Sequence, residues 1–423
     1  MPTRISVARV SRLVEAFVPS RLGGGFRWLL ASSWISNLGD GVALAAGPLL
    51  VASQTDSALL VALGATLQWL PPLLFGLFAG ALTDRIDRRL IVITVNVIRC
   101  VVLGLLTVSI VTGAVSIAVV LLALLLLATA EAFADNASQT LLPMLVRRDD
   151  LTVGNARLQT GFITLNQMAG PLLGAALFAA GAAWPFVTEA VLVAAAAILI
   201  SRVTLPAAAS TRTGRTGMFR DIVEGLRWTW HHAAVRTLIL TIFTFNITFG
   251  AAWSVLVLYA TQRLGMGPVG FGAIALVQAL GGLAGTLAYG WITRRISLGD
   301  LMRIGLIIET LTHAALALTT VPWVAMVIFF VFGAHAFVWG TTSITVRQRA
   351  VPAALQGRAT SVNVVGVYGG LVAGSALGGL LAQHYGVTAP FWFAFAGSAV
   401  FIVLIWRQLS HIAHDDEPQT QDA

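Results

Sequence analysis

Long apolar runs separated by short polar segments dominate the hydrophobicity pattern of this chain. A helix needs about 20 apolar residues to cross a bilayer. Runs of that length lie near 27–52, 59–82, 90–112, 115–141, 156–181, 184–203, 235–262, 268–292, 299–320, 322–345, 359–383 and 388–408. Because a segment in lipid must satisfy its own backbone hydrogen bonds, each run is expected to be helical. The pattern predicts an all-α membrane protein with twelve transmembrane helices.

The composition agrees with a lipid environment. Hydrophobic residues make up 57% of the 423 positions and charged residues 10%, with a mean hydropathy of +0.85. A soluble domain has about a quarter of its residues charged, so this chain could not cover a water-facing surface. The single Cys100 excludes an intramolecular disulfide framework and a cysteine-ligated zinc cluster. We expect no cofactor and no metal site.

The net charge of +8 raises the possibility of nucleic-acid binding, but the arginines form no basic stripe on a soluble module. They gather in alternate loops, and the chain has no lysine. The arginine-containing segments are 4–21, 85–89, 147–148, 212–227, 294–295 and 347–358, and Arg263 is the exception on the opposite side. By the positive-inside rule both termini face the cytoplasm, in a multi-pass cell-membrane protein of a bacterial inner membrane.

The sequence repeats weakly at an offset of 209 residues. The offset aligns Arg27 with Arg236, Asn37 with Asn246, Gly41 with Gly250, Gly76 with Gly285, Arg85 with Arg294, Gln139 with Gln348 and Pro143 with Pro352. Such a repeat predicts two pseudo-symmetric six-helix bundles, 27–203 and 235–408, with a site near the bilayer midplane. A cytoplasmic segment 1–26, a linker 204–234 with an amphipathic helix, and a polar tail 409–423 complete the predicted organisation.

Residues 80–89, between the second and third spans, read GALTDRIDRR. This segment resembles the signature loop of the major facilitator superfamily, Gly-x-Leu-x-Asp-Arg-x-x-Arg-Arg. Gly170-Pro-Leu-Leu-Gly-Ala175 is similar to the core of the superfamily's exporter motif. Residues 141–158 and 350–362 resemble the drug-exporter branch that includes macrolide and enterobactin efflux proteins. The resemblance covers nearly the whole chain and implies export by alternating access.

The signature loop implies a conformational latch. Its residues here are Gly80, Asp84, Arg85, Arg88 and Arg89. By resemblance, Asp84 would accept hydrogen bonds from the start of the eleventh span, near Gly357, in one conformation only. The arginines could pair with Asp84, Asp87, Asp149 and Asp150. The alternative is that these arginines only mark the cytoplasmic side.

Ionisable residues inside the spans are costly and are functional candidates by default. The first half contains Asp40, Arg99, Glu131 and Asp135. At ~1.5 Å per residue, Arg99, Asp135 and Glu131 lie roughly 14, 12 and 18 Å from the cytoplasmic side, so we expect Arg99 to pair with one of these two acids. The other acid could then bind and release a proton. Asp40 belongs to a Gly-Asp pair that resembles the exporter branch. Purely structural ion pairs are the alternative.

The second half has its own ionisable residues. Glu309 and His313 are one helical turn apart, and His335 lies in the next span. Because histidine titrates near neutral pH, this group could also carry protons, although both histidines are better read as structural. Glu189 lies close to the outer boundary, where we expect it to snorkel.

Polar and aromatic residues in the spans could line a substrate cavity. They are Asn37, Gln68, Trp69, Asn166, Gln167, Asn246, Trp253, Tyr259, Gln278 and Tyr368. Aromatic faces with a carboxylate suit amphiphilic or cationic molecules. The alternative for each is packing between helices or at the membrane interface.

The sequence contains no GxxxxGK[ST] phosphate loop and no motif of an enzyme, and its polar portion is too small to hold a catalytic domain. We therefore expect a secondary active transporter, a proton-coupled monomeric exporter of small amphiphilic molecules such as a drug, antibiotic or siderophore. The alternative within transport is an importer or uniporter of a metabolite. The alternative of another class is a non-transporting receptor or a lipid scramblase.

Overall fold

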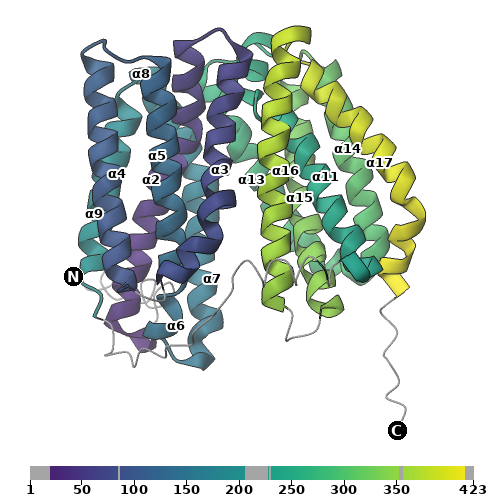
Figure 1. Cartoon of the computed structure of the whole chain (residues 1–423), viewed down its shortest axis with the longest axis horizontal. Coiled ribbons are helices and arrows are strands. Elements are labelled where there is room, and N and C mark those ends of the chain that lie inside the picture. Colours follow the sequence, from purple (N-terminus) through teal and green to yellow (C-terminus); the bar gives the residue numbers. More distant parts are fainter. Residues whose placement is uncertain (1–19, 84–85, 205–226, 228–229, 352–355, 415–423) are drawn as a thin grey trace, which may run out of the picture. The chain divides into compact units, whose positions relative to one another are not determined.

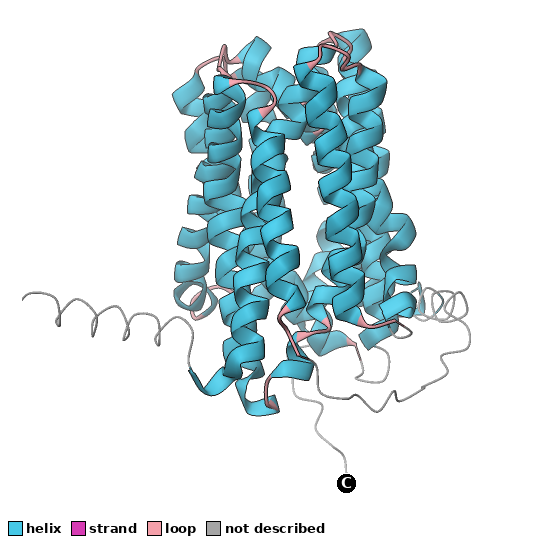
Figure 2. Cartoon of the chain, turned by 90° about the vertical axis from the view of Figure 1, so that its left-hand side faces the viewer, coloured by secondary structure: helices cyan, strands magenta, loops and turns pink. Residues whose placement is uncertain are grey.

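The computed structural model describes residues 20–83, 86–204, 227, 230–351 and 356–414. These residues form helices joined by short loops, and none of them lies in a strand (Figure 2). Twelve of the helical segments are long and apolar enough to cross a membrane. The predicted all-helical membrane fold with twelve spans is confirmed, and every predicted apolar run overlaps one of these segments.

The contacts of the chain divide it into two units. Unit 1 comprises Met1–Gly47 and Leu74–Thr213, and unit 2 comprises Pro48–Leu73 and Gly214–Ala423. The division differs from the predicted bundles in the segment Pro48–Leu73, which groups with the second half of the chain. The bundle boundaries 27–203 and 235–408 therefore stay a proposal.

Within each unit the long helices run lengthwise beside one another (Figure 1). Two helices belong to both units, α2 (Gly23–Gln54) and α3 (Ala58–Thr83). Unit 1 also contains η1 (Ser20–Leu22), α4 (Arg88–Val111), α5 (Ile117–Gln139), α6 (Leu142–Leu145), η2 (Arg148–Asp150), α7 (Leu151–Gly161), the π-helix η3 (Phe162–Ala169), α8 (Gly170–Ala180) and α9 (Trp184–Ser201). Unit 2 contains α11 (Ala233–Trp253), α12 (Leu256–Leu258), the π-helix η4 (Tyr259–Arg263), α13 (Pro268–Thr293), α14 (Leu298–Leu318), α15 (Pro322–Ala350), α16 (Gln356–Tyr385) and α17 (Ala389–His414).

Local sequence signals fix where several helices begin. Asp87 precedes α4 and its carboxylate accepts a hydrogen bond from the Arg89 amide. Ser116 and Ser297 cap α5 and α14 in the same way. These side chains replace the missing acceptors of the first helical turn. Helices α8, α9, α13 and α15 instead have proline in their first turn, where no amide hydrogen bond is lost.

Two glycines related by the predicted repeat allow close helix packing. A Cβ atom added to Gly41 of α2 would lie 2.6 Å from the Asn166 carbonyl oxygen of η3. One added to Gly250 of α11 would lie 2.8 Å from the Leu371 carbonyl oxygen of α16. In each unit the first span of the half therefore meets the fifth span backbone to backbone.

Two asparagines related by the same offset also adopt the same local structure. Asn37 donates to the Ser33 carbonyl oxygen at 2.7 Å, and Asn246 donates to the Ile242 carbonyl oxygen at 2.7 Å. Each amide thus bonds to the preceding turn of its own helix. Similar local structure at related positions supports the internal repeat.

Some predicted features lie outside the described residues. They include most of the linker with its amphipathic helix, the N-terminal segment up to residue 19, the end of the tail, and Asp84 and Arg85 of the signature loop.

Candidate functional site

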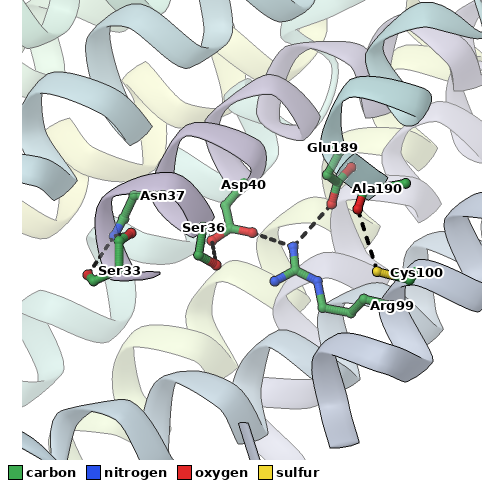
Figure 3. Close-up of polar contacts among 8 residues, drawn as sticks. All are labelled: Ser33, Ser36, Asn37, Asp40, Arg99, Cys100, Glu189 and Ala190. Carbon is green, nitrogen blue, oxygen red and sulfur yellow. Dashed lines mark hydrogen bonds and ion pairs between the residues drawn. The ribbon is translucent and has the colours of Figure 1, made fainter. Parts of the chain in front are cut away.

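Arg99 is the centre of a buried charge cluster in unit 1 (Figure 3). The same guanidinium nitrogen of Arg99 donates to Asp40 Oδ1 on α2 and to Glu189 Oε1 on α9, the latter at 3.1 Å. The three side chains are 3%, 11% and 2% exposed, respectively. Three helices are thereby joined through one cation deep among apolar side chains.

The position of Glu189 follows from the buried face of α9. Phe186, Val193, Ala196 and Ile200 are each at most 1% exposed, and Glu189 falls in their three-and-four spacing. Helix α9 packs this face against α4, which carries Arg99. The carboxylate is therefore directed into the protein.

Two sequence predictions about this cluster were wrong. Arg99 was expected to pair with Glu131 or Asp135, but its ion pairs are with Asp40 and Glu189. Glu189 was expected to snorkel at the outer boundary, but its side chain is buried. The expectation matched depths along the helices and ignored the direction in which each helix face points. The Arg99 side chain is also long enough to reach Glu189, which lies near the start of α9.

Glu131 and Asp135 nevertheless belong to the same electrostatic environment. Both lie on α5, which packs against α4, and their charges interact with those of Asp40 and Arg99. Glu131 is half-buried, whereas Asp135 is exposed. In the described part of the chain neither makes an ion pair or hydrogen bond with Arg99. The group around Arg99 thus combines four carboxylates with one guanidinium.

Few polar groups form hydrogen bonds with the charged atoms of this cluster. Ser36 donates to Asp40 Oδ2 at 3.3 Å. Glu189 Oε2 and Arg99 Nε are buried without a hydrogen-bond partner. The adjacent Cys100 has its Sγ atom 3.5 Å from the Ala190 carbonyl oxygen, so its thiol is directed to the backbone (Figure 3). Among the described residues no group of three or more His, Cys, Asp or Glu side chains could hold a metal ion.

Two arginines of the signature loop donate hydrogen bonds to backbone carbonyl groups. Arg89 donates to the Val203 carbonyl oxygen at 2.9 Å, and its pairing with a loop carboxylate in one conformation stays a prediction. Arg88 donates to the Thr140 carbonyl oxygen at 3.4 Å. Carbonyl groups at helix ends lack N–H donor partners and attract cations, which explains why both arginines bind there.

The loop acids have local roles. Asp87 caps α4, and Asp150 lies 3.4 Å from the guanidinium of Arg21. Gly80 lies near the end of α3, and Asp84 and Arg85 lie outside the described residues.

The ionisable residues of unit 2 form a second group. His335 Nε2 on α15 lies 3.6 Å from Glu309 Oε2 on α14, and the two side chains are 3% and 12% exposed. His313, one turn after Glu309, is completely buried. The sequence placed these three residues near one another, and the structure brings Glu309 and His335 into contact.

The predicted cavity residues of unit 1 make hydrogen bonds within the protein. Asn166 is buried in η3 and accepts a 2.7 Å hydrogen bond from Gln167. Asn37 bonds to its own helix and is half-buried. The π-helix itself was not expected from the sequence; such segments occur frequently at functional sites because they displace a turn of side chains.

The predicted cavity residues of unit 2 separate into two groups. Tyr259 is completely buried and donates to the Leu316 carbonyl oxygen at 2.6 Å, so it packs inside the unit and lines no cavity. Trp253 belongs to an aromatic cluster with Phe249 and Phe332, at centroid distances of 4.4 and 4.7 Å. Gln278 has a buried amide nitrogen without a hydrogen-bond partner. Gln68 and Asn246 are half-buried. The ring centroids of Trp69 and Tyr368 are 6.2 Å apart.

Twelve candidate spans with charges buried inside them are typical of a polytopic membrane transporter. The family model for transmembrane secretion effectors matches residues 15–421. The chain therefore belongs to the transmembrane secretion effector family, within the major facilitator superfamily, and is a transporter rather than an enzyme.

Individual proteins are similar over most of the chain. A multidrug efflux pump, Tap, of Mycolicibacterium fortuitum is 28% identical over 382 residues, covering 86% of this chain and 90% of the pump. The solved nucleoside transporter NupG has a TM-score of 0.73 at 11% identity, covering 91% of this chain and 100% of NupG. A peptide transporter, POT, has a TM-score of 0.72 at 13% identity, covering 96% and 99%. These likenesses to structures show the fold.

Proposed function

We propose that this transporter is a proton-coupled exporter of small amphiphilic molecules, working by alternating access. The similarity to a multidrug efflux pump over 86% of the chain supports export. The charge cluster of unit 1 supports proton coupling and is the observation that carries the proposal.

The cluster holds more acids than cations. Asp40, Glu131, Asp135 and Glu189 share the surroundings of Arg99. If all four carboxylates were ionised, the group would carry a net charge of three negative units, most of it in a low-dielectric interior. Unpaired buried charges of this kind cost several kcal/mol each, on the order of the whole stability of a protein. Binding of protons by the unpaired acids removes this cost.

The acids also differ in the exposed fraction of their side chains. Glu189 is buried, Glu131 is half-buried and Asp135 is exposed. A proton entering at Asp135 could reach Glu131 one helical turn away on the same face of α5. The gradient of exposure supports Asp135 and Glu131 as the exchanging acids, with Asp40 and Arg99 as their electrostatic partners.

The substrate class is proposed from unit 2. Phe249, Trp253 and Phe332 present closely spaced rings, and the Glu309 carboxylate belongs to the same unit. Ring faces bind apolar and cationic groups, and a carboxylate selects positive charge. We include in the proposal the latch at Gly80, Asp84, Arg85, Arg88 and Arg89, cytoplasmic termini in a bacterial inner membrane, and function as a monomer.

Efflux measurements in inside-out vesicles test the proposal. An imposed proton gradient should drive accumulation of a fluorescent amphiphilic cation, and an uncoupler should abolish it. Asp135→Asn and Glu131→Gln should remove uphill transport and leave ligand binding measurable. Asp56→Asn, at an exposed loop carboxylate, is the matched control and should transport normally.

Unchanged gradient-driven transport in both single variants and in their double variant would remove these acids from the mechanism. Uptake in the direction opposite to export would favour a metabolite importer. No flux of any tested molecule, together with lipid movement between leaflets, would favour a scramblase.

A further inference from the structure

One arginine of unit 2 connects two packed helices at the surface of the unit. Helices α14 and α17 lie side by side (Figure 1). The guanidinium carbon of Arg303 on α14 lies 5.3 Å from the centroid of the Trp406 ring on α17. The Arg303 side chain is 23% exposed and Trp406 is 43% exposed. This cation–π contact therefore lies at the edge of the unit and can be reached from outside it.

Arg303 has more hydrogen-bond donors than partners. Its Nη1 atom donates to Asp300 Oδ1 at 3.2 Å, and among the described residues Asp300 is its one hydrogen-bond partner. The other carboxylate oxygen of Asp300 accepts a hydrogen bond from Ser297 at 2.8 Å. A guanidinium carries five N–H donors in a planar fork that fits two oxygens of a phosphate group. Because Nε is buried, the donors open to a further anion are those of the terminal nitrogens.

An apolar surface begins next to Arg303. Ile304, Ile307 and Leu311 are exposed, and their three- and four-residue spacing places them on one face of α14. The exposed apolar residues in the same half of α17 are Val400, Val403 and Leu404. The opposite faces of the two helices are buried in a shared apolar cluster. The outer surface of the pair is thus suited to acyl chains and ends in a cation and an aromatic ring.

The charge at this end of the pair is positive. Arg294 and Arg295 are exposed and directly precede α14, and the Arg295 guanidinium carbon lies 4.1 Å from the centroid of the Trp291 ring. Segment 291–303 contains three arginines and one carboxylate, a net charge of +2. Tryptophan and arginine at the end of a span mark the membrane interface, where basic residues attract anionic headgroups.

The equivalent helices of unit 1 do not have this arrangement. Helices α4 and α9 also pack against each other, but α9 contains no aromatic residue after Phe186. Arg89, at the corresponding end of α4, donates instead to the Val203 carbonyl oxygen. Packing of such a helix pair therefore does not by itself require an arginine that lies over a tryptophan, and the contact in unit 2 has a separate explanation.

We propose that Arg303 and Trp406 form a binding site for an anionic phospholipid. The lipid phosphate accepts hydrogen bonds from the terminal nitrogens of Arg303, which Asp300 and the Trp406 ring hold in position. The acyl chains lie along the exposed apolar face that begins at Ile304. The bound lipid bridges α14 and α17 and stabilises unit 2. This site is independent of the charge cluster of unit 1 and of proton coupling.

Native mass spectrometry of the full-length protein in detergent measures this binding directly. Phosphatidylglycerol should bind to the wild type at least about fivefold more tightly than phosphatidylcholine with the same chains, because one arginine beside an anionic headgroup contributes about that factor. In Arg303→Gln and in Trp406→Leu the preference should fall below about twofold. No preference in the wild type, or an unchanged preference in both variants, would overturn the site.

Arg236→Gln is the matched control for diffuse charge. Arg236 is another arginine of unit 2 beside a tryptophan, 5.9 Å from the Trp230 ring centroid, but its guanidinium donates to the Trp230 carbonyl oxygen. The substitution removes the same charge as Arg303→Gln, so this variant should keep the preference for phosphatidylglycerol. Equal loss of the preference in Arg236→Gln and Arg303→Gln would show that net charge attracts the lipid and would overturn a defined site.

Thermal unfolding distinguishes a lipid from a free phosphate. Saturating phosphatidylglycerol should raise the unfolding temperature of the wild type by at least about 2 °C and leave that of Arg303→Gln unchanged. Glycerol 3-phosphate carries a phosphate without acyl chains and should have no effect on either protein. An equal rise with glycerol 3-phosphate would exclude a role for the apolar face and would overturn the lipid as the ligand.

Photocrosslinking locates the bound lipid. A phosphatidylglycerol with a diazirine in its acyl chain should label peptides of α14 and α17 in the wild type. Labelling of these peptides should fall in Arg303→Gln to the level obtained with the matching phosphatidylcholine probe. Labelling confined to other helices, or equal labelling in the wild type and the variant, would overturn the proposed location.

Discussion

Arg99 and Glu189 are 90 residues apart in the sequence, yet a guanidinium nitrogen of Arg99 lies 3.1 Å from Glu189 Oε1. The same nitrogen bonds to Asp40, so one cation holds two carboxylates on two other helices. With side chains only 3% and 2% exposed, this ion pair lies inside unit 1. Substitution of Arg99 and substitution of Asp40 should therefore differ in their effects on stability and on transport.

Arg99→Gln should destabilise the protein strongly. The substitution leaves Asp40 and Glu189 as neighbouring buried carboxylates without a cation, and loss of one member of a buried pair costs about 3–5 kcal/mol. Denaturant unfolding in detergent should show a free energy of unfolding lower by that amount. Arg303→Gln breaks a pair whose side chains are 23% and 58% exposed, and should cost less than about 1 kcal/mol. Equal losses in the two variants would contradict the central position of Arg99.

Asp40→Asn should affect transport more than stability. The amide still accepts a hydrogen bond from Arg99, and Glu189 still balances its charge. The variant removes the negative charge that acts on Glu131 and Asp135, so uphill efflux should fall at least about tenfold, which corresponds to about 1.4 kcal/mol. Downhill exchange of substrate should continue. Vesicle assays with and without a proton gradient separate uphill efflux from downhill exchange. Normal gradient-driven efflux would exclude Asp40 from coupling.

Gly41→Ala should weaken the packing of α2 on η3. The added Cβ would lie 2.6 Å from the Asn166 carbonyl oxygen, which is backbone and cannot move aside easily. Overpacking of this kind costs about 1–3 kcal/mol. At Gly104 of α4 nothing lies within 4 Å of the added atom, so Gly104→Ala should be neutral or stabilising by up to about 1 kcal/mol. Thermal unfolding of both variants checks the difference, and a stable Gly41→Ala protein would contradict the close contact.

Arg263→Gln should loosen the end of α14. The Arg263 guanidinium donates to the carbonyl oxygens of Ala317, Leu318 and Thr319, at 3.2 to 3.3 Å. A cation at a helix C-terminus contributes about 1–2 kcal/mol in favourable geometry. Hydrogen exchange should accelerate at the last turn of α14 and nowhere else in unit 2. The exposed Arg294 provides the control, since Arg294→Gln should leave these rates unchanged.

This contact also explains an irregularity in the sequence. Arg263 lies among the loops that otherwise carry almost no arginine, against the charge bias used to predict orientation. Its guanidinium is bound to helix-end carbonyl groups and therefore reports local structure rather than topology. A charge rule counts arginines along the chain and cannot distinguish one that binds a helix end from one that marks the cytoplasmic side.

The sequence by itself determined the twelve helices, because membrane spans need only length, apolarity and internally satisfied backbone, all of which are local properties. It also predicted an internal repeat, and Asn37 and Asn246, which the repeat aligns, make the same bond to their own preceding turns. The resemblance at the signature loop likewise depended on contiguous residues and led to the correct family.

Only the tertiary structure decided which charges meet. Glu189 and Arg99 come from helices whose rotation about their axes is set by packing against several neighbours, so depth along the chain predicted the wrong partner. The spacing of Glu189 with Val193 and Ala196 could have shown that it faces inward, but not which helix it faces. The π-helix that places Asn166 against Gly41 likewise depends on the contact between two segments. Helix formation is local in energy, whereas pairing of buried charges depends on the joint orientation of helices distant in sequence.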